Sequence, residues 1–172
     1  LNIHQYLFSD IYPFAGEIRT EMIHKPNPYA NGNLGGKTVF CMPGFILENL
    51  KSTLNQMKNK VRFIKTREQL LTFLTNYYCD LNIIHPFREG NGRTLRVFLE
   101  LYVKALNSIL PFEPQSLEYR LLTEEDMKKM MDGVMLDAVT NGGRDLIYQV
   151  FDKCLVPKTN QMEENMEERK MK

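Results

Sequence analysis

The stretch of sequence that decides the fold joins two helical patterns near the middle of the chain, and it reads His85-Pro86-Phe87-Arg88-Glu89-Gly90-Asn91-Gly92-Arg93-Thr94-Leu95-Arg96. Before it, apolar side chains recur at spacings of four and three over residues 70–84, which predicts a helix with one buried face. After it, residues 91–106 predict a helix whose middle is apolar nearly all round, as is typical of a central, buried helix. A proline ends the first helix and a Gly-Asn-Gly turn opens the second, so the stretch is a tight connection within one core.

The Gly-Asn-Gly turn is placed to bind an anion. Gly90 and Gly92 have no Cβ, so the backbone there can approach a ligand closely. The first turn of the following helix offers unpaired N–H groups and a positive partial charge. Arg93 and Arg96 lie three residues apart on one side of that helix, where both guanidinium groups can fork onto phosphate oxygens. Because two arginines oppose the helix dipole, they indicate a ligand with more than one negative charge.

Two further side chains of the stretch suit chemistry at a phosphate. Glu89 precedes the turn, and a carboxylate beside a polyphosphate is a ligand that Mg²⁺ takes. His85 ends the first helix, and a histidine with its ordinary pKa of about 6.5 suits a general base near neutral pH. Each residue alone is more often structural, and Phe87 is expected to plug the core. Together, at these spacings, they predict Mg²⁺-dependent attack on a nucleotide phosphate by a hydroxyl that His85 deprotonates.

The rest of the chain is predicted to be mostly helical, with one hairpin near its start. Apolar spacing and helix-start signals predict further helices at residues 3–12, 43–60, 123 onward, 144–155 and 160–170. A capping box at Thr66 and Gln69 starts the helix that leads into the central stretch. Residues 26–37 are rich in Gly, Pro and Asn and predict a loop between two short strands, at 22–24 and 38–41.

Composition bounds the function classes. The chain has 172 residues, of which 43% are hydrophobic and 25% charged, as expected for one globular domain. Lys and Arg number 22 and Asp and Glu 21, so the net charge of +1 gives no reason to expect nucleic acid or a membrane surface as a partner. The three cysteines favour free thiols in a reducing compartment. With no signal peptide or membrane-spanning stretch recognised in this sequence, a cytoplasmic location is expected.

The central stretch resembles the Fic (Fido) family, whose signature is His, any residue, Phe, any residue, Asp or Glu, Gly-Asn-Gly-Arg, two residues and Arg. The resemblance extends to residues 7–19, which are similar to the family's opening helix and Phe-Ala-Gly turn. It implies a mainly α fold, the Fic/Fido helical fold, with a small β-hairpin flap at about residues 22–41. The domain organisation implied is a Fic domain at 1–156 and a C-terminal helix at 157–172.

The activity that the resemblance implies is protein AMPylation, the transfer of AMP from ATP to a Tyr, Thr or Ser hydroxyl of a target protein. His85 would be the base and Glu89 the Mg²⁺ ligand. The ATP-binding residues implied are Gly90, Asn91, Gly92, Arg93, Arg96 and, near the adenine, Asn141. The residues implied to position the target are Thr38, Val39, Phe40 and Cys41 in the flap. Fic proteins of the cell-filamentation type often dimerise, so a second copy of the chain joins ATP and the target protein among the partners considered.

The C-terminal helix resembles an inhibitory helix that some Fic proteins carry. The family pattern is Ser or Thr, three residues, Glu, then Gly or Asn, and here Asn160 stands at the first position and Glu164 at the second. The resemblance implies that Glu164 pairs with Arg96 and blocks the γ-phosphate. A register using Glu163 and an inhibitory segment upstream of Leu1 are the alternatives.

Other activities remain open at this stage. Fic relatives that act as kinases carry Lys in place of the second glycine of the loop, whereas this chain has Gly92, which favours AMP transfer. Transfer of UMP or phosphocholine, hydrolysis of a nucleotide and removal of AMP are compatible with the same segment. A regulator that acts mainly by binding is the alternative from another class, although such a role would not require His85 and Glu89.

Overall fold

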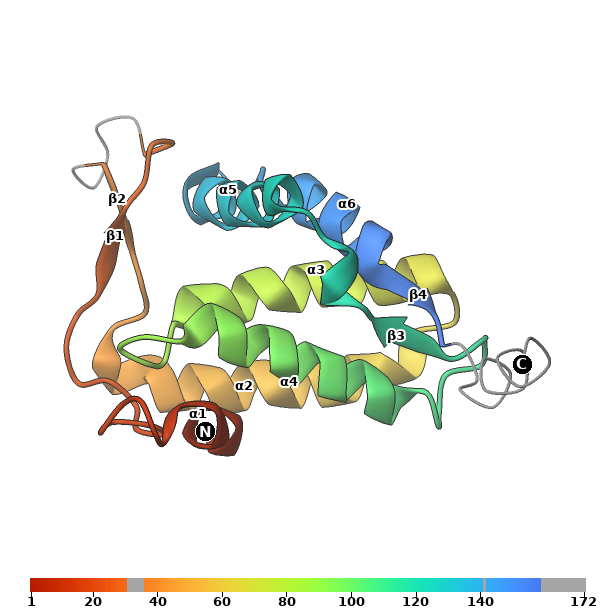
Figure 1. The fold of residues 1–172 in the computed structure, drawn as a ribbon, viewed down its shortest axis with the longest axis horizontal. Helices are drawn as coiled ribbons and strands as arrows, with labels where there is room; N and C mark the ends of the chain where they lie inside the picture. The colour runs from red at the N-terminus through yellow and green to blue at the C-terminus, as the bar shows by residue number, and fades with distance from the viewer. Residues whose placement is uncertain (31–35, 141, 159–172) are drawn as a thin grey trace, which may run out of the picture.

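The computed structural model describes residues 1–30, 36–140 and 142–158, and this part of the chain is mainly helical, as predicted (Figure 1). Its elements, in chain order, are α1 (Asn2–Phe8), β1 (His24–Pro26), β2 (Lys37–Val39), α2 (Ile46–Lys60), α3 (Arg67–Ile84), α4 (Asn91–Leu106), β3 (Gln115–Leu117), α5 (Glu124–Thr140), α6 (Arg144–Cys154) and β4 (Leu155–Pro157). Short 3-10 turns lie at Pro43–Phe45, Val61–Phe63 and Tyr119–Leu121.

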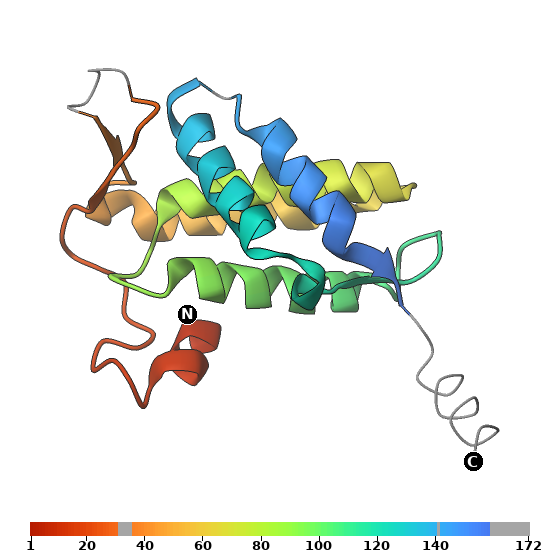
Figure 2. The same ribbon diagram turned by 45° about the horizontal axis from the view of Figure 1, so that its top comes forward.

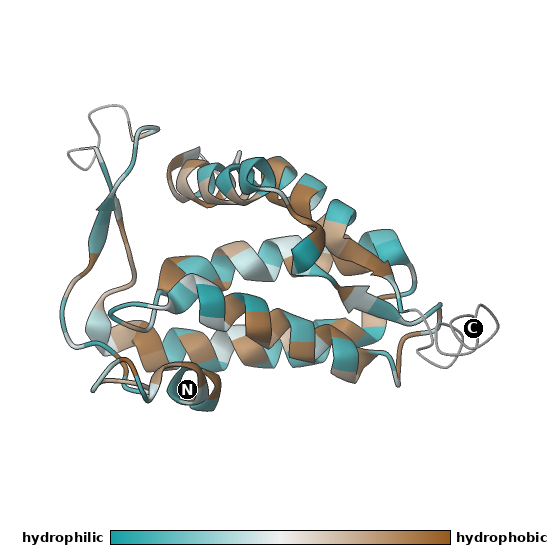
Figure 3. Cartoon of the chain, in the orientation of Figure 1, coloured by the Kyte–Doolittle hydropathy of each residue, from teal (hydrophilic) through white to brown (hydrophobic). Residues whose placement is uncertain are grey.

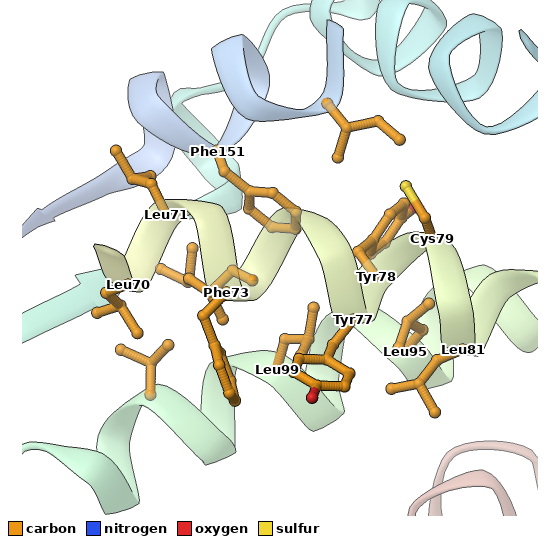
Figure 4. Packing of buried hydrophobic residues seen from close by; sticks show 14 of the residues in the cluster. Leu70, Leu71, Phe73, Tyr77, Tyr78, Cys79, Leu81, Leu95, Leu99 and Phe151 are labelled. Atoms are coloured by element: carbon orange, nitrogen blue, oxygen red, sulfur yellow. The ribbon is translucent and has the colours of Figure 1, made fainter. Parts of the chain in front are cut away.

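The core is built around α3, which packs against α2, α4, α5 and α6. Figure 4 shows side chains of α3 pointing both toward α4, where they meet Leu95 and Leu99, and toward α6, where they meet Phe151. The ring of Tyr78 meets that of Phe151 edge to face, with centroids 5.4 Å apart. The predicted apolar face of α3 is buried throughout, at Leu70, Leu74, Tyr77, Leu81 and Ile84. The helix that leads into the deciding stretch is therefore packed against four other helices.

The ends of α3 and α4 form for the reasons that the sequence indicates. The Thr66 hydroxyl accepts the N–H of Gln69, which confirms the predicted cap of α3. The helix ends where His85 takes a left-handed conformation, with φ 49°. Gly90, with φ 80°, caps the start of α4. The prediction that α4 is a central, buried helix holds for one face only, since Leu95, Leu99, Val103 and Leu106 are buried whereas Leu101 is exposed.

Two predicted elements have different bounds. The first helix ends at Phe8 rather than at residue 12, because the N–H groups of Ile11 and Tyr12 both donate to the Phe8 carbonyl and close a turn. The first strand of the hairpin lies two residues later than predicted, at His24–Pro26 and not at 22–24, and His24 pairs with Val39. After Val39 the chain leaves the hairpin. The Phe40 N–H still donates to the Ile23 carbonyl, but the Cys41 N–H donates to the Ile83 carbonyl of α3.

A second small sheet was not predicted. Strand β3 pairs with β4 in antiparallel register, Gln115 opposite Pro157 and Leu117 opposite Leu155, and it fastens the end of α6 to the segment after α4. Figures 1 and 2 place this sheet at the end of the bundle opposite the β1–β2 hairpin. In the part of the chain that the structure describes, no helix is long and apolar enough to cross a membrane.

The β1–β2 hairpin stands beside the start of α4 and the end of α5 (Figures 1 and 2). Figure 3 shows that β1 is hydrophilic, in contrast to the brown stretches of the helices. One buried side chain ties the hairpin down: the Asn27 amide donates to the Thr38 hydroxyl at 2.7 Å and to the Met135 carbonyl of α5 at 2.8 Å. This side chain therefore fixes the hairpin to α5.

Candidate active site

His85 lies at the C-terminal end of α3 with its side chain 5% exposed. Its Nδ1 atom is 3.1 Å from the Asn82 carbonyl, and because a carbonyl only accepts, Nδ1 carries the proton. The lone pair is thus on Nε2. The ring stacks on that of Phe40, from the end of the hairpin, with centroids 3.8 Å apart and an interplanar angle of 20°. Two elements distant in sequence therefore fix the orientation of this imidazole.

The environment keeps His85 neutral. Burial lowers its pKa to about 4, and the positive charges of Lys25 and Arg19 act in the same direction. The hydrogen bond to Asn82 and the Glu89 carboxylate oppose the shift. Neutral His85 with an available Nε2 is the form that a general base requires at neutral pH.

The loop between α3 and α4 is shaped by its own side chains. The Asn91 side chain accepts the Phe87 N–H at 2.9 Å and donates to the Phe87 carbonyl at 2.7 Å. Phe87 is buried, as predicted. A Cβ added at Gly90 would lie 2.6 Å from the Phe8 ring, and its φ of 80° also favours glycine. The Asn91 side chain therefore holds the loop, and what this residue offers a ligand is its backbone N–H.

His4 supports the same loop and was not identified from the sequence. It is fully buried, and its Nδ1 accepts the Gly16 N–H at 2.8 Å while Nε2 lies 3.0 Å from the Glu89 carbonyl. The carbonyl partner assigns the proton to Nε2. The ring stacks on Phe87 at 3.8 Å. Its position in α1, far from the motif in sequence and outside residues 7–19, gave no signal.

The first turn of α4 brings the predicted anion-binding groups together. The N–H groups of Asn91, Gly92 and Arg93 belong to this turn, where no preceding helical carbonyl is available to them. The Arg93 guanidinium lies 4.6 Å from the centre of the Phe8 ring. Arg93 and Arg96 both line a groove of about 310 Å³ that runs between α4 and the α1 region. The two predicted guanidinium groups therefore share one groove, which Glu100 and Tyr119 also line.

Glu89 directly precedes this turn. Its Oε1 accepts the Gly90 N–H at 2.9 Å. Within the described residues, no group of three or more His, Cys, Asp or Glu side chains is placed to hold a metal ion. The donor set fits a cation that binds one carboxylate and completes its shell with phosphate oxygens and water, which is the usual habit of Mg²⁺.

The four predicted flap residues differ in what they can contact. Thr38 is buried and its hydroxyl is bonded to Asn27, so its side chain holds the hairpin. Phe40 is buried against His85 and shields the base. Val39 is 41% exposed, and Cys41 is half-buried with its N–H bonded to the Ile83 carbonyl at 3.0 Å. Of the four, Val39 presents the most side-chain surface outward.

Two predicted site residues, Asn141 and Glu164, lie outside the described residues. The start of α6, close in sequence to Asn141, is held by Arg144, which bonds Asn76 and Asp80 of α3 and Asp137 of α5 at 2.8–3.1 Å.

Known proteins are similar to this chain over the region that contains the connection between α3 and α4. A model of the Fic/DOC family matches residues 1–103. A protein adenylyltransferase of Bartonella henselae is 32% identical over 168 residues, which cover 91% of this chain and 28% of that protein. A probable protein adenylyltransferase Fic of Salmonella typhimurium is 29% identical over 99 residues, covering 57% of this chain and 44% of that protein. The chain therefore spans less than half the length of either relative.

Solved structures share the fold. BepC, a VirB-translocated effector protein of Bartonella tribocorum solved with bound AMPPNP, is similar with a TM-score of 0.68 and 19% identity over 92% of this chain and 73% of that one. The N-terminal Fic domain of a Bep effector from Bartonella quintana gives a TM-score of 0.70 and 21% identity, over 96% and 73%. The family match covers more than half of the sequence and includes the whole connection between α3 and α4. The chain belongs to the Fic/DOC family.

Proposed function

We propose that this chain transfers AMP from ATP to the hydroxyl of a Tyr, Thr or Ser side chain on a target protein, with release of pyrophosphate. One observation carries the proposal: a buried, neutral His85 with its lone pair on Nε2 ends the helix that leads directly into the N-terminus of α4, whose first two turns carry Arg93 and Arg96. The names of the Bartonella henselae and Salmonella relatives support AMP transfer. AMPPNP in the similarly folded BepC supports a nucleoside triphosphate as the ligand.

In this mechanism His85 removes the proton from the target hydroxyl through Nε2. The oxygen attacks the α-phosphorus and forms a new P–O bond, while the bond from that phosphorus to the β-bridging oxygen breaks and pyrophosphate leaves with the electron pair. The triphosphate raises the pKa of His85 when it binds, because negative charge favours the imidazolium. A pKa raised from its low starting value makes Nε2 a stronger base for the hydroxyl proton.

The anion site acts on the phosphates. The first N–H groups of α4 would bind the α- and β-phosphates, and Arg93 and Arg96 would offset the charge that develops on the leaving pyrophosphate. Glu89 would hold Mg²⁺, which adds positive charge to the same oxygens. If the Glu89 carboxylate held the cation, the Gly90 N–H that it accepts here would become available to a phosphate oxygen.

Label transfer from α-³²P-ATP with Mg²⁺, to the chain itself and to proteins of a cell lysate, tests the proposal. We expect labelled protein with the unmodified chain and a loss of about 10²- to 10⁴-fold in His85→Ala, the range for removal of a general base. His24→Ala is the control: it removes an exposed histidine of the β1–β2 hairpin and should retain activity. Label from γ-³²P-ATP instead would identify phosphate transfer and overturn the proposal.

We further propose that Glu164 inhibits this activity by pairing with Arg96. Its support is the position of Glu164 in the C-terminal segment and the match of Glu164-Asn165 to the family's inhibitory pattern. In the same assay Glu164→Gly should label protein more strongly than the unmodified chain, whereas Glu163→Gly should not. A stronger signal from Glu163→Gly would assign the inhibitory role to the alternative register.

A further inference from the structure

Arg19 is a charged side chain buried in the protein at only 2% exposure. Its side chain makes four hydrogen bonds, all to backbone carbonyls: Nε to His85 at 2.7 Å, Nη1 to Glu21 at 2.6 Å, and Nη2 to Cys41 at 2.5 Å and to Ile84 at 3.4 Å. Within the described residues it forms no ion pair. A buried cation satisfied in this way is costly to keep, which indicates a specific role.

The position of Arg19 is explained by the helix that it caps. Ile84 and His85 supply carbonyls at the C-terminal end of α3, where the helix dipole is negative and a cation is stabilised. The backbone N–H of Arg19 adds a further bond, to the Pro86 carbonyl at 2.9 Å. Three successive carbonyls of the turn that contains His85 are thus held by one residue.

This turn is strained. His85 is the one non-glycine residue with positive φ in the described part of the chain. Such a conformation persists only where the surroundings hold it in place, because a side chain with a Cβ disfavours it. The bonds from Arg19 to the carbonyls before, at and after His85 do so, and the bond from the imidazole to the Asn82 carbonyl adds to them.

The same guanidinium also reaches the hairpin. Its bond to the Cys41 carbonyl, together with the bond from the Cys41 N–H to Ile83, fixes the strand that carries Phe40. Phe40 is the residue whose ring stacks on His85. Arg19 therefore supports His85 in two ways: it holds the His85 backbone, and it fixes the segment whose Phe40 ring covers the imidazole.

We propose that Arg19 is a positioning residue that holds His85 in its left-handed conformation and fixes the hairpin over its ring. This role rests on the proposed function, in which His85 is the base. Arg19 acts through His85 and Phe40, not on the phosphates. The effects of charge and of geometry can be separated: Lys keeps the charge but lacks the fork that reaches four carbonyls at once, and Met removes the charge.

The test compares Arg19→Lys and Arg19→Met with Arg67→Lys and Arg67→Met. Arg67 is the control at the other end of α3: its guanidinium also bonds backbone carbonyls, those of Asp152 and Leu155, and in addition pairs with the Asp152 carboxylate at 2.7 Å. We expect Arg19→Lys to slow label transfer at saturating ATP by about 100-fold, the effect of misplacing a reacting group, with ATP affinity by calorimetry unchanged. Both Arg67 variants should keep the rate of the unmodified chain.

Two readouts do not depend on AMP transfer. The chain has three histidines, so the His85 ring can be assigned by NMR against His85→Ala. The pKa of His85 should stay low in Arg19→Lys and rise in Arg19→Met, because a facing positive charge is lost while Lys25 and Glu89 remain. Amide exchange at Phe40 and Cys41 should quicken in both variants but in neither Arg67 variant.

If the unmodified chain transfers no AMP, the proposed function fails, and the NMR titration and the amide exchange alone decide the positioning role. If Arg19→Met does not fold, Arg19→Lys decides it through turnover and exchange. Equal losses in the Lys variants of Arg19 and Arg67, or exchange at the hairpin that is the same in all proteins, would overturn the proposal.

Discussion

At the scale of single residues, the site is built by polar side chains that bond to the backbone. Arg19, His4 and Asn91 each bond main-chain groups of the connection between α3 and α4, and Asn27 does the same for the hairpin. Buried polar groups are stabilising only when satisfied, so each of these contacts restricts the loop to one geometry. The groups expected to meet the ligand, Nε2 of His85 and the first N–H groups of α4, are left for it.

Gly90 tests how closely this geometry is determined. Replacing it with Ala combines a positive φ with a Cβ placed 2.6 Å from the Phe8 ring, so we expect the free energy of unfolding to fall by about 2–5 kcal/mol. Gly36→Ala is the control, because Gly36 has a φ of 71° and nothing within 4 Å of the added Cβ. It should cost only the conformational part, about 1–2 kcal/mol. Urea unfolding measures both, and equal losses would mean that the contact with Phe8 is unimportant.

At the scale of elements, the sequence predicts well where a signal is long or chemically specific. The helix α4 has the bounds predicted for it, and α3 has its predicted cap and buried face, because each repeats apolar residues over several turns. Strands of three residues such as β3 and β4 cannot show an alternation, so that sheet was missed. The first helix was predicted too long because Tyr12 continues its apolar pattern although the chain has already turned at Phe8.

At the scale of elements, the N-terminal cap of α3 makes a testable contribution to stability. Thr66→Ala removes the hydroxyl that accepts the Gln69 N–H, and we expect the free energy of unfolding to fall by about 1 kcal/mol. Thr72→Ala is the control from the same helix: its hydroxyl bonds the Glu68 carbonyl within the helix, and Ala has the higher helix propensity, so stability should stay the same or rise slightly. Thermal denaturation of the two variants would contradict this reading if Thr72→Ala lost as much as Thr66→Ala.

At the scale of the whole molecule, the candidate site combines segments that are distant in sequence. The opening segment supplies His4 and Arg19, the hairpin supplies Phe40, and the α3–α4 connection supplies the remaining groups. The motif identified the last of these because its chemistry is local. The supporting residues come into contact only through the fold, and neither periodicity nor spacing points to them. The prediction of the site was therefore most complete for the groups facing the ligand and least complete for those that orient them.

The pH dependence of stability is a property of the whole molecule that these environments predict. Burial lowers the pKa of His85 to about 4 and also lowers that of His4, so between about pH 4 and 6.5 the unfolded chain binds more protons and acid destabilises the fold. Burial raises the pKa of Cys79 and of Cys154 from 9.0 to about 12, so the folded chain holds these protons longer and stability also falls as the pH rises above 9. Stability should peak between about pH 6.5 and 9.

Urea unfolding from pH 4 to pH 10 measures this curve. His85 alone, shifted from 6.5 to about 4, should account for a loss of about 3 kcal/mol on going from pH 7 to pH 4. His85→Gln has no group to titrate there, so its acid limb should be flatter by that amount whatever its stability at pH 7. His24→Gln, at an exposed position of the hairpin, should keep the slope of the unmodified chain. An acid limb as steep in His85→Gln as in the unmodified chain would show that His85 takes up its proton as readily in the folded protein as in the unfolded one, and the neutral base on which the mechanism depends would then be absent below about pH 6.5.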